Sequence, residues 1–346
     1  MAAPISNSAW LEWITSLLEG PSRPKCAAAF PPGLFHCLLD ELPLHLMPRW
    51  FFRLQPSHDV LGQTLFLNSN CRILPAAEVP PELESRADLL SGFARQGTIA
   101  WVGEPHKGTL SPFWLGARLE SVVASLSPGV PVNLREEDRL LLAWAGILIS
   151  SDRAELQERE WEEVLARRGP LFREAGYAPV GNLIHPLNLA ALRRYYRYQI
   201  RTGAIELGDG QSARRYVAYN DKVARFFHCQ IAKAVSDIAG DAVKPSYVYM
   251  ASYLSGAELK KHTDRPQCEF SVTMCIDFSP EPEVETPWPI KLDTTRGTVT
   301  AYQAPGDGLV YRGTRLPHYR SVLGRGQTST SIFFHYVPED FAGSLD

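Results

Sequence analysis

Two histidines and one aspartate of this chain have the types and spacing that suit a metal site. His262 and Asp264 stand two positions apart, and His318 follows 54 residues after Asp264. Side chains at positions i and i+2 of a β-strand point to the same face, so one short strand can present both His262 and Asp264. Two histidines and one carboxylate on one side of a metal leave its other side open, the arrangement of non-haem Fe(II) sites. The spacing therefore predicts a mononuclear iron site.

A His-x-Asp pair by itself occurs in many proteins, and a lone histidine on a strand is more often a core or surface residue. The flanking sequence favours a metal site over these ordinary structural roles. Upstream, the pattern is Tyr253-x-x-Gly256-x-x-Leu259-x-x-His262-x-Asp264. Downstream, a Gly-Asp turn and an apolar strand, Pro305-Gly306-Asp307-Gly308-Leu309-Val310-Tyr311, lead directly to His318.

This order of motifs resembles the 2-oxoglutarate- and Fe(II)-dependent oxygenases, especially their prolyl-hydroxylase-like branch. The resemblance covers about residues 170–340 and is strongest over 245–337. It implies a double-stranded β-helix (jelly roll) that holds Fe(II) in its mouth and uses 2-oxoglutarate and dioxygen as cosubstrates. Because Asp264 is a carboxylate rather than Gly or Ala, a halogenase, which needs a vacant site for chloride, is disfavoured.

The sequence departs from the family at the cation that binds the far carboxylate of 2-oxoglutarate. That Arg or Lys usually stands nine to eleven residues after the distal histidine, where this chain has Gln327, Thr328 and Ser329. Arg320 shares the inward face of His318 and supplies the planar fork that suits a carboxylate. We prefer Arg320 to Arg325, which lies in a Gly-Arg-Gly turn.

Further cosubstrate contacts are expected from side chains nearby. Tyr253 matches the family's tyrosine near the cosubstrate, although a core aromatic explains it equally well. The hydroxyl groups of Thr328 and Thr330 are expected to donate hydrogen bonds to the same carboxylate. Arg265, next to Asp264, is placed to touch a substrate at the mouth. His335 lies outside the triad pattern, and His185 and His228 sit beside predicted helices, where core or cap roles are expected.

The elements that position these residues change character along the chain. Helical spacing predicts helices over 8–18, 33–46, 135–150, 151–168, 186–201 and 218–239. After Lys244-Pro245 the hydrophobic period switches from 3.6 to 2, and seven short strand patterns follow, most of them bounded by Gly, Pro or Asp. Helices followed by many short strands predict an α+β fold, with a jelly roll supported by helices on one face. Residues 55–135 give no clear fold.

Composition excludes several classes of partner. The chain has 346 residues, 35 basic and 38 acidic, with a formal net charge of −3, so no nucleic-acid partner is expected. No apolar run reaches the 18–20 residues needed to span a bilayer, and the first residues lack a secretory signal. Six scattered cysteines without a CxxC pair predict reduced, mostly buried thiols. We expect a cytoplasmic protein.

The chain is expected to divide into two regions. Residues 1–165 form an N-terminal region of unassigned fold, for substrate docking, dimerisation or a lid, and residues 166–346 form the oxygenase domain. The expected reaction is hydroxylation of an unactivated C–H bond in a peptide or amino-acid-derived substrate. Alternatives are a small-molecule hydroxylase or desaturase of the same class, a cupin-like iron enzyme without 2-oxoglutarate, and a non-catalytic binding barrel.

Overall fold

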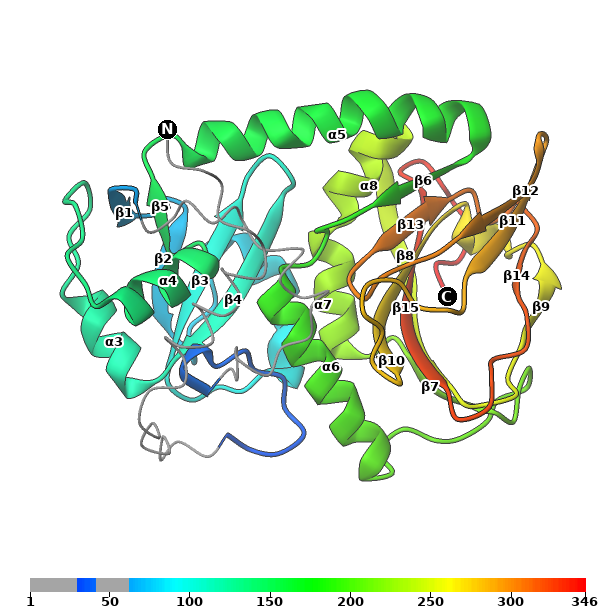
Figure 1. Cartoon of the computed structure of the whole chain (residues 1–346), viewed down its shortest axis with the longest axis horizontal. Helices are drawn as coiled ribbons and strands as arrows, with labels where there is room; N and C mark the ends of the chain where they lie inside the picture. Colours follow the sequence, from blue (N-terminus) through cyan, green and yellow to red (C-terminus); the bar gives the residue numbers. More distant parts are fainter. Residues whose placement is uncertain (1–29, 42–61) are drawn as a thin grey trace.

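Two antiparallel sheets face each other in the C-terminal half of the computed structural model, which describes residues 30–41 and 62–346 (Figure 1). The six-stranded sheet has the order β6 (Tyr177–Val180), β13 (Gly308–Tyr311), β10 (Phe270–Ser279), β15 (Thr328–Pro338), β8 (Val243–Tyr253) and β7 (Arg215–Tyr219). The four-stranded sheet has the order β12 (Gly297–Ala301), β11 (Ile290–Thr294), β14 (His318–Arg320) and β9 (Leu259–His262). The predicted α+β class with a double-stranded β-helix is confirmed.

Side chains that alternate along β15 show that one face of the six-stranded sheet packs into the hydrophobic core and the other lines a cavity. Ile332, Phe334 and Tyr336 are buried in the large hydrophobic core that the helices share. Phe333 and His335, on the other face, line a cavity between the sheets. The helices that cover the sheet are α6 (Pro186–Arg201), α7 (Lys222–Gln230) and α8 (Ala232–Ala239), which contact β8 and β10. Because neighbouring residues of a strand face opposite sides, one sequence builds both the core and the cavity wall.

The N-terminal half contains a second, smaller set of sheets. Its strands are β2 (Cys71–Pro75), β3 (Thr98–Glu104) and β4 (Thr109–Leu115) in one sheet, and β1 (Leu65–Leu67) paired with β5 (Leu148–Ser150). Among residues 30–41 and 62–152, the helices are η1 (Leu39–Glu41), η4 (Pro81–Gly92), α3 (Ala117–Ala124) and α4 (Glu136–Trp144). Helix α5 (Arg153–Ala175) runs from this half along the top of the molecule to the barrel (Figure 1).

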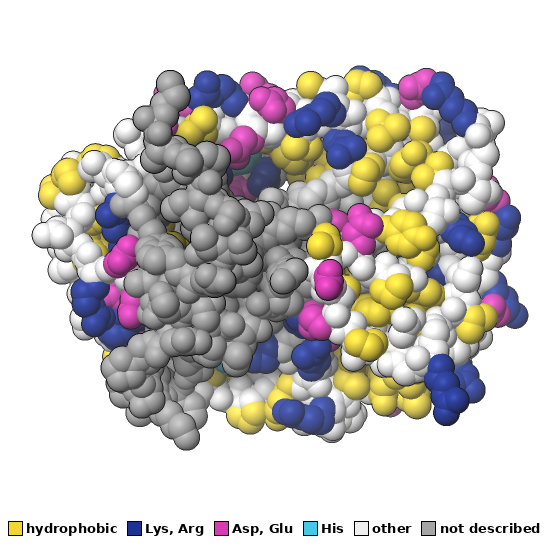
Figure 2. Space-filling view, viewed as in Figure 1, with side chains coloured by type: hydrophobic (Ala, Val, Ile, Leu, Met, Phe, Trp, Pro, Cys, Tyr) yellow, Lys and Arg dark blue, Asp and Glu magenta, His cyan; other side chains and the backbone are white. Residues whose placement is uncertain are grey.

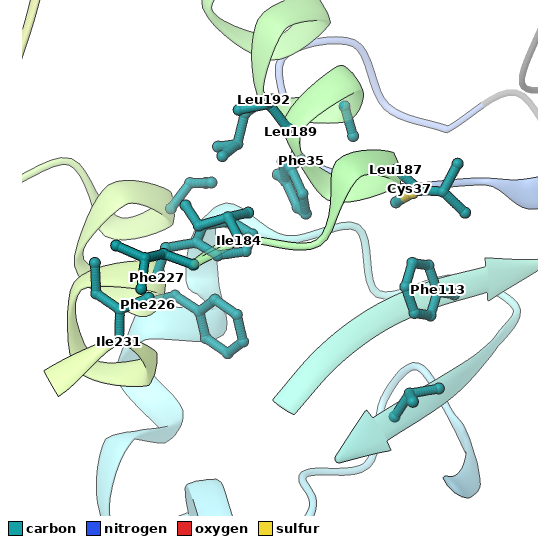
Figure 3. Packing of buried hydrophobic residues seen from close by; sticks show 14 of the residues in the cluster. Phe35, Cys37, Phe113, Ile184, Leu187, Leu189, Leu192, Phe226, Phe227 and Ile231 are labelled. Atoms are coloured by element: carbon teal, nitrogen blue, oxygen red, sulfur yellow. The ribbon is translucent and has the colours of Figure 1, made fainter. Parts of the chain in front are cut away.

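Aromatic side chains join the two halves. Figure 3 shows Phe35 and Phe113 of the N-terminal half beside residues of α6 and α7. Phe35 meets Phe227 edge to face at 5.6 Å, and Phe93 meets Phe226 at 4.9 Å. These residues belong to one continuous core. The predicted boundary at 165/166 falls inside α5, and the division into two regions remains a prediction.

Most predicted elements of the second half are present. The helix over 186–201 and the seven strands after Pro245 are confirmed, whereas the helix over 218–239 breaks at Ile231 into α7 and α8. The helix predicted over 151–168 is present as α5 and extends to Ala175. Gly176, with φ 76°, ends it. The stretch 135–150 is helical only to Trp144 and continues as β5.

Of the helix predicted over 33–46, the described part contains only the short 3-10 helix η1 (Leu39–Glu41), and the prediction is wrong for residues 33–38. The Phe35 N–H donates to Gly92 O, and Cys37 O accepts from the Trp114 N–H, so the backbone is used for bridges to other segments. The helix predicted over 8–18 lies outside the described residues. Strands β6 and β7 were not predicted, because each is short and follows a helix pattern.

Surface charge and hydropathy agree with the composition. On the face shown in Figure 2, basic and acidic side chains are interspersed among apolar ones. Among the helices of residues 30–41 and 62–346, none has the length and apolar character needed to cross a membrane. The five described cysteines are free thiols, as expected.

Candidate metal centre

Strands β9 and β14 bring the two predicted histidine ligands side by side. His262 and His318 are direct partners in the antiparallel pairing, and their ring centroids lie 4.4 Å apart. Asp264 follows β9, and its Oδ1 lies 3.5 Å from Nε2 of His262 and 3.5 Å from Nε2 of His318. The structure thus brings together all three residues that the sequence singled out.

Backbone carbonyl groups fix the orientation of both imidazoles. Nδ1 of His262 lies 2.7 Å from Lys260 O, and Nδ1 of His318 lies 2.9 Å from Leu316 O. Each Nδ1–H therefore donates to a carbonyl two residues earlier in the chain, which leaves Nε2 as the ligand atom. His318 is buried and His262 lies at the rim of the cavity.

The other carboxylate oxygen of Asp264 is held by a chain of polar groups. Ser271 Oγ donates to Asp264 Oδ2 at 2.9 Å and lies 2.9 Å from His335 Nδ1. The Asp264 N–H donates to Gly313 O. Burial alone would raise the pKa of Asp264, but hydrogen bonds from His262 and His318 hold it well below its usual range. The carboxylate is thus ionised, and its Oδ1 faces the two Nε2 atoms, where a cation would bind.

The donor set fits a divalent first-row metal. Two adjacent donors about 2.1 Å from an octahedral ion stand roughly 3 Å apart, close to the observed separations between Asp264 Oδ1 and the two Nε2 atoms. The hydrogen bond with Asp264 also raises the pKa of His262, as expected beside an ionised carboxylate. Two imidazoles, one carboxylate and an open side are the ligand set of non-haem Fe(II).

A cavity of about 1140 Å³ opens beside the three residues. Its wall is rich in aromatic side chains, and it also contains basic residues and three acids. The aromatic members are Tyr219, Tyr247, Tyr249, Tyr253, Tyr311 and Phe333. Tyr311 Oη lies 3.4 Å from Nε2 of His318, so this phenol lies directly against the histidine pair.

Arg320, the preferred anchor, is buried and is not among the residues that line this cavity. Its Nη1 donates to Trp288 O at 2.5 Å, its Nη2 donates to Gln303 Oε1 at 2.9 Å, and its guanidinium lies 4.9 Å from the Trp288 ring centroid. It forms no ion pair with a carboxylate of the described residues, and its Nε has no hydrogen-bond partner among them. Burial lowers its pKa.

The other candidate cosubstrate residues are placed differently. Tyr253 lines the cavity and accepts a hydrogen bond from Arg215 Nη1 at 3.3 Å. Arg325 lies exposed in the turn before β15, away from the cavity lining. Thr330 pairs with Ser252 rather than with cavity-lining Tyr253, so Thr328 and Thr330 lie on the opposite face of β15. The structure does not bring Arg325, Thr328 or Thr330 to the site.

Several residues of the site were missed by sequence reasoning. Ser271, Gly313 and Gln303 carry no recognisable motif, and their positions depend on the fold of distant strands. His335 was set aside as outside the triad pattern, yet it lies one hydrogen bond from Ser271. The period-2 alternation Ser331–Phe333–His335 was the available signal for an inward face. His185 and His228 have the cap and core roles that were predicted.

Comparisons with known proteins give matches in structure alone. No protein-family model matches the sequence, and no curated protein matches it. The solved structures it resembles include the non-haem alpha-ketoglutarate-dependent epimerase SnoN from nogalamycin biosynthesis (13% identity, TM-score 0.42, 52% of this chain and 83% of that chain). Others are a 2OG-Fe(II) oxygenase family oxidoreductase from Burkholderia pseudomallei (15%, 0.41, 52% and 92%) and a Pseudomonas putida prolyl-4-hydroxylase (15%, 0.41, 50% and 99%).

Proposed function

We propose that this chain is an Fe(II)- and 2-oxoglutarate-dependent oxygenase that hydroxylates an unactivated C–H bond. The observation that carries the proposal is the convergence of His262 Nε2, Asp264 Oδ1 and His318 Nε2 at the edge of a large cavity. Bound Fe(II) would supply the redox chemistry that couples decarboxylation of 2-oxoglutarate by dioxygen to oxidation of the substrate.

Arg320 supports a dicarboxylate cosubstrate. A buried guanidinium without a carboxylate partner is unfavourable, because burial removes its water and nothing replaces the lost charge stabilisation. A carboxylate that reaches Arg320 would supply the missing ion pair. The stacked Trp288 and the amide of Gln303 hold the fork in one orientation, and Gln303 is itself fixed by donating to Thr273 O at 2.9 Å.

Two orphaned hydroxyl groups support the same interpretation. Thr273 Oγ1 and Ser331 Oγ are buried without a hydrogen-bond partner among the described residues. Thr273 stands opposite Phe333, which lines the cavity, and Ser331 lies two residues before Phe333 on the same strand face. Buried polar atoms without partners mark places where a ligand or water belongs. We infer that the cosubstrate extends from the cavity to Arg320, Thr273 and Ser331, which carry these buried atoms and lie outside the cavity lining.

In this proposal the side chains of the protein position the metal and the cosubstrate and keep water from the reacting atoms. His262, Asp264 and His318 hold the metal on one side. Arg320 orients the cosubstrate from behind, and the barrel wall excludes water from the reacting centre. The cavity is large enough to take a substrate beside the cosubstrate.

The test is anaerobic binding of Fe(II) and 2-oxoglutarate, followed by the visible metal-to-ligand charge-transfer absorption of the chelate. Wild type should show the band and His262→Ala should not. Arg320→Gln should weaken the affinity for 2-oxoglutarate by about tenfold or more, since a charge-assisted hydrogen bond is lost. Arg325→Gln is the matched control and should leave that affinity unchanged.

Aerobic turnover separates the remaining alternatives. Succinate formation from 2-oxoglutarate that requires all three metal ligands supports the oxygenase. Bound iron without the band and without succinate would instead indicate a cupin-like enzyme. Absence of iron binding in wild type would indicate a binding barrel.

A further inference from the structure

A basic residue without an acidic partner among the described residues, Arg265, lines the mouth of the cavity. Arg265 directly follows Asp264, so their Cα atoms are about 3.8 Å apart. It is exposed, and it forms no ion pair with a carboxylate of the described residues. Arg215, which also lines the cavity, by contrast pairs with Asp209. Arg265 is thus a cation that stands at the entrance beside the metal ligands.

Two tyrosines hold the Arg265 guanidinium in place. Its Nε donates to Tyr247 Oη at 3.2 Å, its Nη2 donates to Tyr219 Oη at 2.9 Å, and its centre lies 4.3 Å from the Tyr247 ring centroid. The two rings stack at 5.1 Å. A guanidinium has five N–H donors, so these two contacts leave N–H groups that suit a carboxylate. An ordinary surface arginine is not fixed in this way.

Tyr247 is in turn fixed relative to the metal ligands. Its Oη lies 3.0 Å from Cys268 Sγ, and its ring lies 4.6 Å from the ring of His335. His335 connects through Ser271 to Asp264. The distance between Arg265 and the metal ligands is therefore set by packed and hydrogen-bonded groups, as a positioning site requires.

Charge around the cavity favours an anion. Of its three acids, Asp209 is engaged by Arg215 and Tyr249, and Asp264 faces the two histidines. Glu258 is the remaining acid in the lining. The basic lining residues besides Arg215 are Arg214, Lys260 and Arg265. Cations that outnumber uncommitted acids raise the local concentration of anionic ligands.

We propose that the substrate is a carboxylic acid with an aromatic or aliphatic body, whose carboxylate binds the free edge of Arg265. Its body lies against the tyrosine wall formed by Tyr219, Tyr247 and Tyr249, and this places a C–H bond beside the metal. That this carboxylic acid is oxidised at the metal rests on the proposed function. That Arg265 binds a carboxylate does not.

The test measures binding of matched probes by ligand-observed NMR, anaerobically, with Fe(II) and 2-oxoglutarate saturating so that Arg320 is occupied. The probes are 3-phenylpropionate, its uncharged amide and 2-phenylethyl phosphate. Wild type should bind the carboxylate about tenfold more tightly than the amide. Arg265→Gln should reduce this preference to about one, and Arg265→Lys should restore part of it. Arg296→Gln, at a surface ion pair with Glu174, should keep the full preference.

Three outcomes would overturn the proposal. They are equal binding of acid and amide in wild type, a preference that persists in Arg265→Gln, and tighter binding of the phosphate, which would assign a phosphate substrate. The charge-transfer band is recorded in every sample. Its loss in Arg265→Gln alone would show that Arg265 supports the metal site rather than a ligand. Its absence from wild type would reject the oxygenase, while the difference between wild type and Arg265→Gln would still report on the anion site.

Discussion

Ser271 connects the Asp264 carboxylate to the barrel wall, and its hydroxyl is the last link of a chain that begins at His335. Ser271→Ala should lower the affinity for Fe(II) by 10–100-fold, because groups that orient a ligand typically contribute that much. Competition with a coloured chelator measures it. Ser255→Ala, which removes a hydroxyl bonded to Gln327 O at the surface, is the matched control. Equal affinities for Fe(II) in the two variants would show that Asp264 does not depend on Ser271 for its orientation.

Gly313 occupies a position at which no other residue fits. A Cβ there would lie 2.5 Å from Cys268 O and 2.6 Å from Ser271 Oγ, and also against Asp264 Oδ2. Gly313→Ala should therefore displace the carboxylate and abolish tight Fe(II) binding. The control is Gly181→Ala, whose new Cβ would have only one neighbour, at 3.8 Å. Wild-type iron affinity in Gly313→Ala would contradict the role of this close approach.

Sequence alone singled out the three residues that the structure brings together, because they carry a local motif. His262 and Asp264 share one strand end, and the Gly-Asp turn introduces His318. Arg320 was preferred because it shares the face of His318, and its role as the cosubstrate anchor stays a prediction. The groups around them could not be found in this way, since Ser271, Gln303 and Gly313 meet the site only after strands distant in sequence have paired. The alternation Ser331–Phe333–His335 groups these residues on one face of the strand, and the pairing of β15 with β8 decides that this face, rather than that of Thr330, points inward.

At the scale of elements, α6 is attached to β10 by a cluster of charged groups. Asp277 accepts hydrogen bonds from Arg193 Nε at 2.6 Å and from Arg197 Nε and Nη2 at 2.6 and 2.8 Å. Asp277→Asn should lower the free energy of unfolding by about 2 kcal/mol, because it weakens pairing of the largely buried Arg193. Urea denaturation measures it. Asp88→Asn, which breaks an exposed pair with Lys222, should have no effect, and equal effects would argue against an anchoring role.

Helices and strands were predictable from sequence where a single hydrophobic period, 3.6 or 2 residues, dominates the segment. The helix over 186–201 has a Pro at its first turn and a regular apolar face, and its bounds agree with the structure. The barrel strands have clear alternation. The segment at 33–41 failed because its buried Phe35 and Cys37 look helical in sequence, whereas tertiary pairing with Gly92 and Trp114 determines its backbone.

At the scale of the whole molecule, buried neutral histidines make stability depend on pH. Burial lowers the pKa of His185 to about 4, and the ring already accepts from the Leu187 N–H and lies 3.0 Å from Trp144 O. The unfolded chain binds a proton there below its ordinary pKa near 6.5, and the folded chain does not. Stability should therefore fall as pH drops from 6.5 toward 4.

The expected size of this effect is about 2 kcal/mol between about pH 7.5 and about pH 5, from His185 alone. Urea denaturation at the two pH values measures it. In His185→Gln, whose amide can donate and accept as the neutral ring does, the free energy of unfolding should fall by about 2 kcal/mol less than in wild type over the same pH range. Identical falls in both proteins would show that His185 does not contribute.

The shared core predicts that the barrel does not fold alone. Residues 166–346 would begin inside α5 and would expose Phe226 and Phe227, which pack against Phe93 and Phe35. We expect this fragment to be unfolded or aggregated by circular dichroism and size-exclusion chromatography. A soluble fragment that binds Fe(II) as tightly as the full chain would assign the N-terminal half a purely accessory role.

The backbone contacts of the two histidines also bear on how such a site endures sequence change. Each Nδ1–H is bound by a carbonyl within its own tripeptide, at Lys260 and at Leu316. Every residue type supplies that carbonyl, so replacement of the neighbouring side chains leaves the tautomer and the aim of Nε2 intact. Such a centre can persist through extensive divergence of the surrounding chain, provided that the two strands keep their register.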